Sequence, residues 1–203
     1  MTRESDKPEI VRRLVVVFDI SSSTSILEEL KQCDRLAVWR NLLIELKNFL
    51  DAHGLDIDIY KFMGDGWILL FPEEVKKEEL FEYLNHVSTF YMLQYQEYVE
   101  PLLQKDPSPI GLTFGIDTGE LIRLQMNEQW EYLGRAINVA ARLQSAAKGM
   151  ANDGYTNVAL ISKACFNSLR PEKSEFKASE QKVDLKNISG GDKFQCFALP
   201  LCT

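Results

Sequence analysis

The sequence predicts a single α/β domain of the α+β type, in which helices pack on a mostly antiparallel central sheet. Three observations predict this class. Short β-branched apolar runs alternate with segments of helical periodicity, turns that contain glycine join neighbouring strands, and no Pro-, Gly- or Ser-rich linker divides the chain. A length of 203 residues suits one domain with a substantial core, so we expect residues 1–203 to fold as one unit.

The N-terminal half is expected to follow the order strand, helix, hairpin, helix. A Ser/Thr-rich loop after the first strand offers an N-cap for the first helix. The predicted elements are a buried strand at Arg13–Ile20, helical residues from Ser25 to Leu50 with a break at Lys31–Arg35 and an end at Ala52–Gly54, a hairpin at Ile59–Phe71 and a helix over Lys76–Val99 that Pro101 closes.

The C-terminal half is expected to return to the sheet three times, with a helix after each of the first two returns. The predicted elements are two strands over Ile110–Met126 bent at Asp117–Gly119, a strand from Glu131 that passes at Gly134 into an Ala-rich helix, a strand at Asn157–Ser162 before a small helix, and a closing hairpin over Val183–Leu199 around Ser189–Asp192.

Charge and hydropathy exclude several classes of protein. The net charge of −7 argues against a general nucleic-acid or membrane-surface binder, which carries a basic face. No apolar run approaches the roughly 20 residues that span a bilayer. The charged N-terminus lacks the apolar segment of a signal peptide. We therefore expect a cytoplasmic protein without a nucleic-acid or membrane partner.

The cysteines do not predict a zinc site. No two of them have Cys-x-x-Cys spacing, and both histidines are distant in sequence. Without an export signal we expect them to be reduced and structural. They are Cys33, Cys165, Cys196 and Cys202.

Two aspartates lie at the ends of predicted strands. Asp19 ends the first strand, and Asp65 lies between two glycines at the tip of the hairpin. If the two strands are neighbours, the carboxylates meet at one sheet edge, where they repel unless a proton or a cation lies between them. Mg²⁺ or Mn²⁺ with phosphate oxygens suits such a pair, and the N–H groups of the adjacent loop, Ser22, Ser23 and Thr24, suit phosphate. The alternative is that both aspartates are ordinary cap and turn residues.

Four blocks, in this order, resemble the signature blocks of class III nucleotidyl cyclases. They are "FDISSST", "YKFMGDG", "GIDTGEL" and "EYLGRAINVAARLQ". Each block alone is common, whereas four in the order of the family are specific. The resemblance covers nearly the whole chain, from about 14 to 199, and implies the fold of that family.

The resemblance implies roles for individual residues. Asp19 and Asp65, with the Ile20 carbonyl, match the ligands of two divalent cations, Mn²⁺ or Mg²⁺. Phe18 would line the nucleotide site, and Lys61 and Glu131 match the pair that reads the base. Asn138 matches the asparagine that orients the ribose, and Arg142 the arginine that stabilises the transferring phosphate.

Family members build each site from two chains, so the resemblance implies a head-to-tail homodimer with two shared sites. The final hairpin departs from the family, because glycine stands near the position of a lysine that contacts the terminal phosphates. Lys186 or Lys193 is the expected substitute. The tryptophans are expected in the core or at an interface rather than around a ligand; they are Trp39, Trp67 and Trp130.

The predicted base pocket admits several nucleotides. Lys61 only donates hydrogen bonds and ionised Glu131 only accepts them, which suits adenine, cytosine or, with the contacts exchanged, uracil. Glu131 is longer than Asp, and Tyr60 adds bulk if it turns inward, so both favour a single-ring base. The compact chain also resembles the pyrimidine cyclases of Pycsar anti-phage defence, whose cyclic nucleotide activates a separate effector.

The leading hypothesis is therefore a cyclase that converts UTP to 3′,5′-cyclic UMP and pyrophosphate. The alternatives are a cytidylate cyclase, a conventional adenylate cyclase, and a catalytically inactive module that binds nucleotide.

Overall fold

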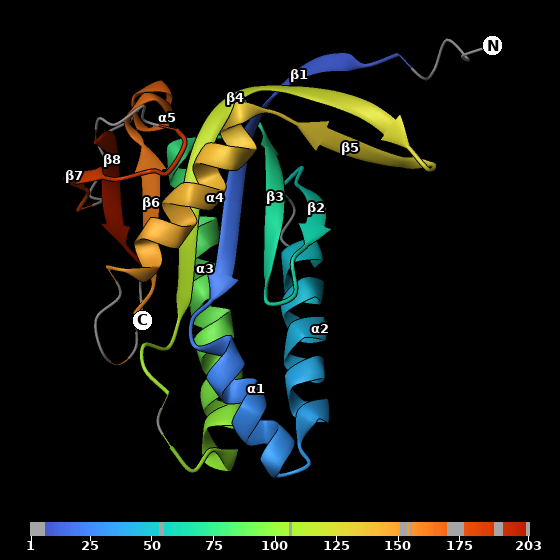
Figure 1. Ribbon diagram of the computed structural model, residues 1–203, viewed down its shortest axis with the longest axis vertical. Helices are drawn as coiled ribbons and strands as arrows, with labels where there is room; N and C mark the ends of the chain where they lie inside the picture. The colour runs from blue at the N-terminus through green and yellow to red at the C-terminus, as the bar shows by residue number, and fades with distance from the viewer. Residues whose placement is uncertain are drawn as a thin grey trace.

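The structure is a computed structural model that describes residues 7–52, 55–105, 107–150, 154, 156–169, 177–188 and 193–201. Within these residues one sheet has the strand order β2-β3-β1-β4-β6-β8-β7, and β5 pairs with the outer part of β4 (Figure 1). All neighbouring strands are antiparallel except β4 and β6. The expected α/β class and mostly antiparallel sheet are confirmed.

The strands are β1 (Glu9–Ile20), β2 (Asp58–Phe62), β3 (Gly66–Pro72), β4 (Leu112–Met126), β5 (Gln129–Leu133), β6 (Val158–Ser162), β7 (Ser179–Val183) and β8 (Phe194–Pro200). The helices are α1 (Ser23–Gln32), α2 (Leu36–Ala52), α3 (Lys77–Gln94), α4 (Arg135–Lys148) and α5 (Lys163–Ser168), with a π-helical turn η2 (Tyr95–Val99) and a 3₁₀ turn η3 (Glu100–Leu102) after α3. No helix in the described ranges is long and apolar enough to cross a membrane.

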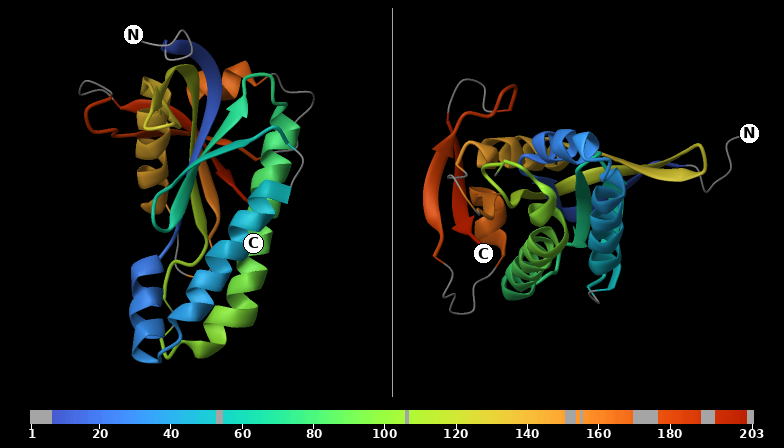
Figure 2. Two further views of the ribbon diagram at one scale, coloured as in Figure 1. Left: turned by 90° about the vertical axis from the view of Figure 1, so that its right-hand side faces the viewer. Right: turned by 90° about the horizontal axis from the view of Figure 1, so that it is seen from below.

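Side chains alternate between the two faces of the central strand β1. Val16 and Phe18 belong to the large core cluster that includes residues of α1, α2 and α3. Val15 and Val17 belong to a second cluster with residues of α4. The sheet therefore has α2 and α3 on one face and α4 on the other, as the left view in Figure 2 shows, and α1 extends beyond the end of the sheet. By the same alternation Asp19 lies on the α4 face.

Helix α4 packs unusually close to β4. A Cβ atom at Gly115 would lie 1.9 Å from the carbonyl oxygen of Ala140 and 2.2 Å from the nitrogen of Gln144. Only glycine permits this approach, because any side chain would overlap the helix backbone. The contact fixes α4 over the sheet, and its last turn reaches the end of β1.

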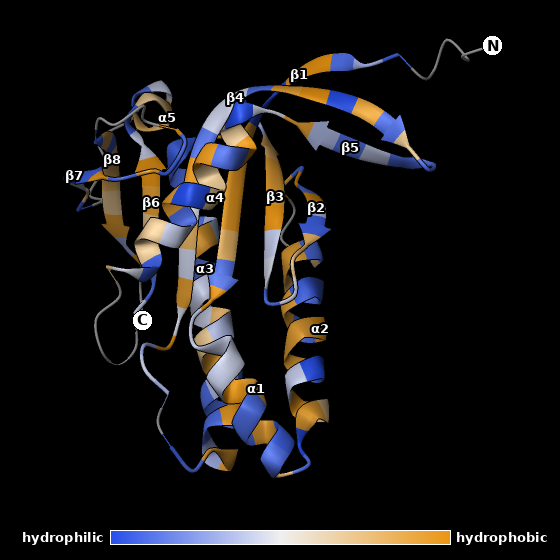
Figure 3. Cartoon of the chain, viewed as in Figure 1, coloured by the Kyte–Doolittle hydropathy of each residue, from blue (hydrophilic) through white to orange (hydrophobic). Residues whose placement is uncertain are grey.

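The ends of three strands extend beyond the body of the molecule as an arm (Figure 1). The first residues of β1 pair with the last residues of β4, which also pair with β5. Figure 3 shows hydrophobic residues along this arm as well as in the sheet interior. The arm carries large apolar side chains that are exposed in the single chain: Ile10, Ile122, Met126, Trp130 and Leu133.

Most elements predicted for the N-terminal half are present. The break between α1 and α2, the tight turn between β2 and β3, and the helix after it are confirmed. Strand β1 begins earlier than predicted, at Glu9, because its first residues pair with the arm of β4. The predicted left-handed cap at Gly54 lies outside the described residues.

The prediction of two strands over Ile110–Met126 was wrong. β4 is one continuous strand, because β1 pairs with it without interruption, including Arg13 opposite Gly119. The chain reverses instead at Asn127 and Glu128, which both have positive φ. This turn joins β4 to β5, the strand predicted from Glu131.

The elements predicted near the C-terminus are partly confirmed. β6 and α5 match the predicted strand and small helix. β7 ends at Val183, where the closing hairpin was predicted to begin, and the predicted turn at 189–192 lies outside the described residues.

Candidate active site

Asp19 and Asp65 lie together at one edge of the sheet. Asp19 pairs in register with Gly66, the residue after Asp65, and the Ile20 N–H donates to the Asp65 carbonyl at 3.1 Å. A Cβ atom at Gly66 would lie 2.0 Å from the Phe18 carbonyl oxygen. Glycine thus allows the hairpin to approach β1 closely enough for the two carboxyl groups to interact.

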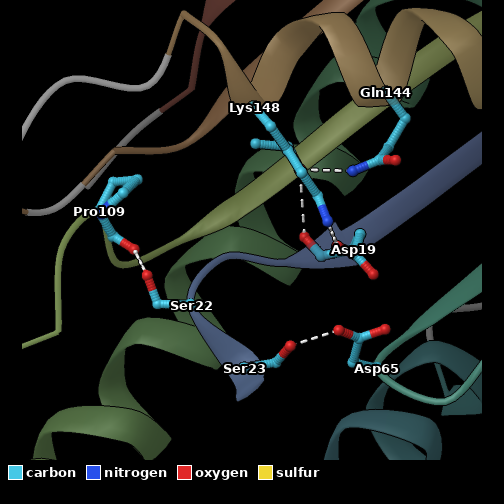
Figure 4. A network of polar contacts seen from close by, with 8 residues as sticks. Asp19, Ser22, Ser23, Asp65, Pro109, Gln144 and Lys148 are labelled. Carbon is cyan, nitrogen blue, oxygen red and sulfur yellow. Dashed lines mark hydrogen bonds and ion pairs between the residues drawn. The ribbon is translucent and has the colours of Figure 1, made fainter. Parts of the chain in front are cut away.

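Asp19 is almost entirely buried, with 8% of its surface exposed. The Lys148 ammonium forms an ion pair with Oδ2 of Asp19, an oxygen that is buried from solvent (Figure 4). Burial raises the pKa of Asp19 to about 6; its hydrogen bond with Asp65 adds to the rise, and Lys148 opposes it. The site therefore contains two coupled carboxyl groups and one ammonium.

In the serine-rich loop after β1, Ser23 contacts the aspartate pair, and the predicted side-chain N-cap of α1 is not formed. The Ser23 hydroxyl donates to the Asp65 carboxylate, so Ser23 helps to hold the second aspartate. The Ser22 hydroxyl donates to the Pro109 carbonyl at 2.8 Å, and Ser22 makes no side-chain cap of α1. Its left-handed backbone, with φ of 56°, accounts for the missing cap, because a side-chain N-cap normally needs an extended backbone. Thr24 is exposed at the start of α1.

The residues at this edge fit divalent cations. Two adjacent carboxyl groups, one of them almost entirely buried, form a hard, anionic oxygen site of the kind that Mg²⁺ or Mn²⁺ prefers. The described residues contain no group of three or more His, Cys, Asp or Glu side chains that could hold a metal. Among these residues the acidic ligands are therefore limited to the two aspartates.

A second polar cluster lies between β2 and β5. The Lys61 ammonium lies 3.3 Å from Oε2 of Glu131, and the Tyr60 hydroxyl donates to the same oxygen. The Tyr132 N–H donates to the Tyr60 hydroxyl at 3.2 Å, which fixes the tyrosine toward Glu131. The hydrogen bond from Tyr60, together with Lys61, lowers the pKa of Glu131. The cluster therefore presents an ionised acceptor beside a cationic donor.

The structure differs from the prediction at Phe18. Its side chain has no exposed surface and packs against Trp67 and Phe114, with ring centroids 5.4 Å away in each case. Because Phe18 precedes Asp19 on the strand, it points to the opposite face, toward the core. We therefore leave Phe18 out of the candidate site.

Asn138 and Arg142 are exposed on α4. The buried stripe of this helix includes Ala136, Val139 and Leu143, which leaves Asn138 and Arg142 toward solvent. Within the described part of the chain neither makes a hydrogen bond or ion pair to Asp19 or Asp65. Within a single chain the two predicted halves of the site are therefore not joined by a direct polar contact.

The remaining residues singled out in the sequence are three tryptophans and two lysines. Trp39 and Trp67 are core residues, whereas Trp130 lies on the arm, where Arg123 stacks on its ring at 3.9 Å. Lys186 and Lys193 lie on either side of residues 189–192, where the turn was predicted and which lie outside the described residues.

Sequence reasoning missed Gln144 and Lys148. Gln144 is buried and donates to Thr113 Oγ1 at 2.8 Å, and the Thr113 hydroxyl lies 3.4 Å from the Asp19 carbonyl oxygen. A glutamine within the apolar stripe of a helix, followed four residues later by a lysine, was the available signal.

No family model matches the sequence, and no curated protein matches it either. The fold, however, is that of the class III adenylyl and guanylyl cyclase catalytic domains.

Three solved structures illustrate the likeness. The adenylyl cyclase CyaB from P. aeruginosa has a TM-score of 0.69 and 22% identity over 96% of this chain and 97% of that one. A bacterial light-regulated adenylyl cyclase has a TM-score of 0.70 and 16% identity over 95% of this chain. The chain spans about half of that protein, 52%. The guanylate cyclase domain of RhGC from Catenaria anguillulae, in complex with GTP, has a TM-score of 0.59 and 16% identity over 97% of this chain and 100% of that one.

Proposed function

We propose that this protein is a nucleotidyl cyclase that converts UTP to 3′,5′-cyclic UMP and pyrophosphate. The observation that carries the proposal is the meeting of Asp19 and Asp65 at one sheet edge, beside the loop that opens α1. The similarity in fold to adenylyl and guanylyl cyclases supports the reaction class. In this reaction the ribose 3′-oxygen bonds to the α-phosphorus, and the bond from that phosphorus to the pyrophosphate oxygen breaks.

Asp19 and Asp65, with the Ile20 carbonyl, would hold two divalent cations, Mn²⁺ or Mg²⁺. When bound, such cations lower the pKa of the 3′-hydroxyl and neutralise charge on the departing pyrophosphate. Ser23 keeps the Asp65 carboxylate oriented, and the backbone of Ser22, Ser23 and Thr24 lies where the triphosphate would bind. The burial of Asp19 Oδ2 supports this role, because a buried carboxylate oxygen needs a positive partner, the place that Lys148 fills in the structure and that a cation would take.

The second half of the site would come from another copy of the chain. The exposed side chains of the partner subunit's Asn138 and the partner subunit's Arg142 would orient the ribose and stabilise the transferring phosphate. Exposure of both residues on α4 supports this arrangement, and the apolar arm supports a homodimer with two equivalent sites.

Lys61, Glu131 and Tyr60 would read the base. Lys61 donates to a base acceptor and Glu131 accepts from a base donor. Because the Tyr60 hydroxyl turns toward Glu131 and uses part of its accepting capacity, the cluster favours a small base with a single N–H donor. Uracil, which offers N3–H beside the O4 acceptor, meets this description.

The same donor and acceptor, Lys61 and Glu131, would also suit cytosine or adenine. Cytosine presents a ring acceptor beside an amino donor, and adenine presents the same pair on a larger ring. The similarity to structures named as adenylyl cyclases favours adenine as the next candidate. A catalytically inactive, nucleotide-binding module is the remaining alternative.

The resemblance to pyrimidine cyclases of anti-phage defence extends the proposal to a biological role. The cyclic nucleotide would act as a second messenger that a separate cyclic-nucleotide-binding effector reads. Synthesis of a pyrimidine product would support this role, whereas cyclic AMP would favour conventional signalling.

The test is incubation of purified protein with equal concentrations of ATP, GTP, CTP and UTP and with Mn²⁺, followed by mass spectrometry of the products. Cyclic UMP as the main product supports the proposal, and its loss in Asp65→Ala links it to this site. If cyclic CMP or cyclic AMP is the main product, the preferred substrate is CTP or ATP rather than UTP. Nucleotide binding without any product, in a dimeric protein, would favour the inactive module.

A further inference from the structure

Lys148 lies at the edge of the sheet where Asp19 and Asp65 meet. Its ammonium forms an ion pair with Oδ2 of Asp19, an oxygen that is buried from solvent. Among the described residues this is the only ion pair that Asp19 makes. A positive charge therefore already lies at the carboxylate to which, according to the proposed function, a cation binds.

The backbone of Lys148 is held in this place by contacts that do not involve its charge. The close approach of Gly115 to Ala140 and Gln144 fixes α4 against β4. Gln144, one turn before Lys148, donates to Thr113, which is the residue opposite Asp19 in the register of β1 and β4. The end of α4 is thus anchored to the strands that carry the site, and Figure 4 shows Gln144 and Lys148 side by side above Asp19.

The side chain of Lys148, in contrast, is free to move. It is 49% exposed, whereas the side chain of Asp19 is only 11% exposed. A lysine has a flexible four-carbon stem and a strongly hydrated ammonium, so it can leave the carboxylate for water without displacing the helix. Asp19 cannot follow it, because its strand is paired on both sides.

We propose that Lys148 is a counter-ion gate: its ammonium neutralises Asp19 in the absence of metal and must leave before a divalent cation binds. This inference rests on the proposed function, because it requires the cation to bind at Asp19 and Asp65. Lys148 and the cation compete for one carboxylate oxygen, and their like charges prevent close simultaneous contact. Lys148 therefore sets the metal concentration at which the site fills, and it is a positioning residue, not a ligand.

A purely structural role makes a different prediction. Lys148 lies in the last turn of α4, where a cation interacts favourably with the helix dipole. Its removal would then lower stability slightly and leave metal affinity unchanged. Metal binding measured directly, without substrate, separates the two roles.

The experiment is a titration of the full chain with Mn²⁺, followed by electron paramagnetic resonance of the free ion, at one buffered pH above the pKa of Asp19. Lys148→Met keeps the length of the side chain and removes the charge, so we expect Mn²⁺ to bind about fivefold more tightly or better. Lys148→Arg keeps a cation and should bind Mn²⁺ much like the unmodified protein, which guards against a defect in folding of the Met variant.

Lys163→Met is the matched control. Lys163 also forms an ion pair, with Glu180 at 3.0 Å, and its side chain is similarly exposed, at 41%. It lies on α5, and we expect Mn²⁺ affinity to stay unchanged. Equal gains in Lys148→Met and Lys163→Met would show a general effect of net charge and would overturn the gate.

Two further variants separate failure of the gate from failure of the metal site. If Asp19→Asn and Asp65→Asn lose Mn²⁺ binding while Lys148→Met binds as the unmodified protein does, the metal site stands and the gate is wrong. If neither aspartate variant changes Mn²⁺ binding, the proposed metal site itself fails. Tighter binding in Lys148→Met alone, abolished by adding Asp19→Asn, is the result that supports the gate.

Discussion

Gly115 of β4 and Ala140 of α4 meet backbone to backbone, with only 1.9 Å between a hypothetical Cβ atom of the glycine and the carbonyl oxygen of the alanine. This contact connects the fold to the candidate site, because α4 carries three of its residues. Asn138 and Arg142 lie on the exposed side of the helix, and Lys148 ends it beside Asp19. The distance between α4 and β4 therefore determines the positions of the Asn138 amide, the Arg142 guanidinium and the Lys148 ammonium.

Gly115→Ala is expected to destabilise the protein by about 2 kcal/mol or more, because the added methyl overlaps helix backbone that cannot rotate away. Gly119→Ala on the same strand is the matched control. Its Cβ would lie 3.5 Å from that of Ala136, an ordinary contact, so its effect should stay within about 0.5 kcal/mol. Urea unfolding monitored by circular dichroism measures both. Equal effects would contradict the close packing of α4.

Asp19→Asn is expected to stabilise the metal-free protein at neutral and alkaline pH. The pKa of Asp19 is raised from 3.8 to about 6, so folding favours the protonated form. That contribution is fully present below pH 3.8 and is lost as the pH rises through about 6. Above this range Asn, a neutral mimic, should raise the free energy of unfolding by on the order of 2 kcal/mol.

Unfolding in EDTA at several pH values measures this effect, with Asp51→Asn as an exposed control. Asp51 is exposed on α2 and forms an ion pair with Lys47 at 2.6 Å, so its variant should change little at any pH. A loss of stability in Asp19→Asn at high pH would mean that the ion pair with Lys148 outweighs the burial of Asp19.

Tyr60→Phe is expected to weaken base recognition without affecting the chemical step. The variant removes the hydroxyl that donates to Glu131, so the KM for the preferred nucleotide should rise about tenfold while kcat changes little. Tyr132→Phe is the matched control, because its hydroxyl donates to Asp58 at 3.1 Å instead. Steady-state kinetics with each nucleoside triphosphate compare the two. An unchanged preference in Tyr60→Phe would remove Tyr60 from the base pocket.

Mixing inactive Asp65→Ala and Arg142→Ala chains should restore activity. Each mixed dimer would have one site with both defects and one site with neither. Equal amounts that exchange freely should therefore regain about a quarter of the activity of the unmodified protein. The control is each variant mixed with itself. Mixed dimers that form but stay inactive would contradict a site shared between chains.

Ile122→Lys is expected to weaken dimerisation, because Ile122 is 46% exposed on the arm and a charge there opposes burial against a partner. The dimer dissociation constant should rise about tenfold or more, measured by sedimentation. Leu93→Lys changes a similarly apolar residue, 58% exposed on α3, and should leave the dimer intact. Dissociation in both variants, or in neither, would contradict the role of the arm.

Local patterns predicted the strand ends that carry Asp19 and Asp65, because a β-branched run and a Gly-Asp-Gly turn are short-range signals. They also predicted the helix α4, on which the structure leaves Asn138 and Arg142 exposed. The position of Phe18 was predictable in principle. A residue adjacent to Asp19 on a strand points to the other face of the sheet, and on that face Phe18 is buried in the core.

Other features depend on long-range contacts that no local pattern contains. Gly119 looked like a bend, yet β1 pairs across it and keeps β4 straight in register. Lys148 looked like the polar end of a helix, and its contact with Asp19 exists only because Gly115 lets α4 approach the sheet. Pairing partners far apart in the sequence decide both cases.

The central place of β1 has a consequence for the order in which the protein assembles during synthesis. β1 precedes β3 and β4 in the sequence, but in the sheet it lies between them. Thr113 of β4, whose hydroxyl lies 3.4 Å from the Asp19 carbonyl oxygen, follows Asp19 by 94 residues. Until β4 leaves the ribosome, one edge of β1 has open hydrogen-bonding groups that can pair with strands of other chains. Closing so long a loop is slow. The order of synthesis therefore leaves the edge of β1 that β4 covers open until β4 has been made.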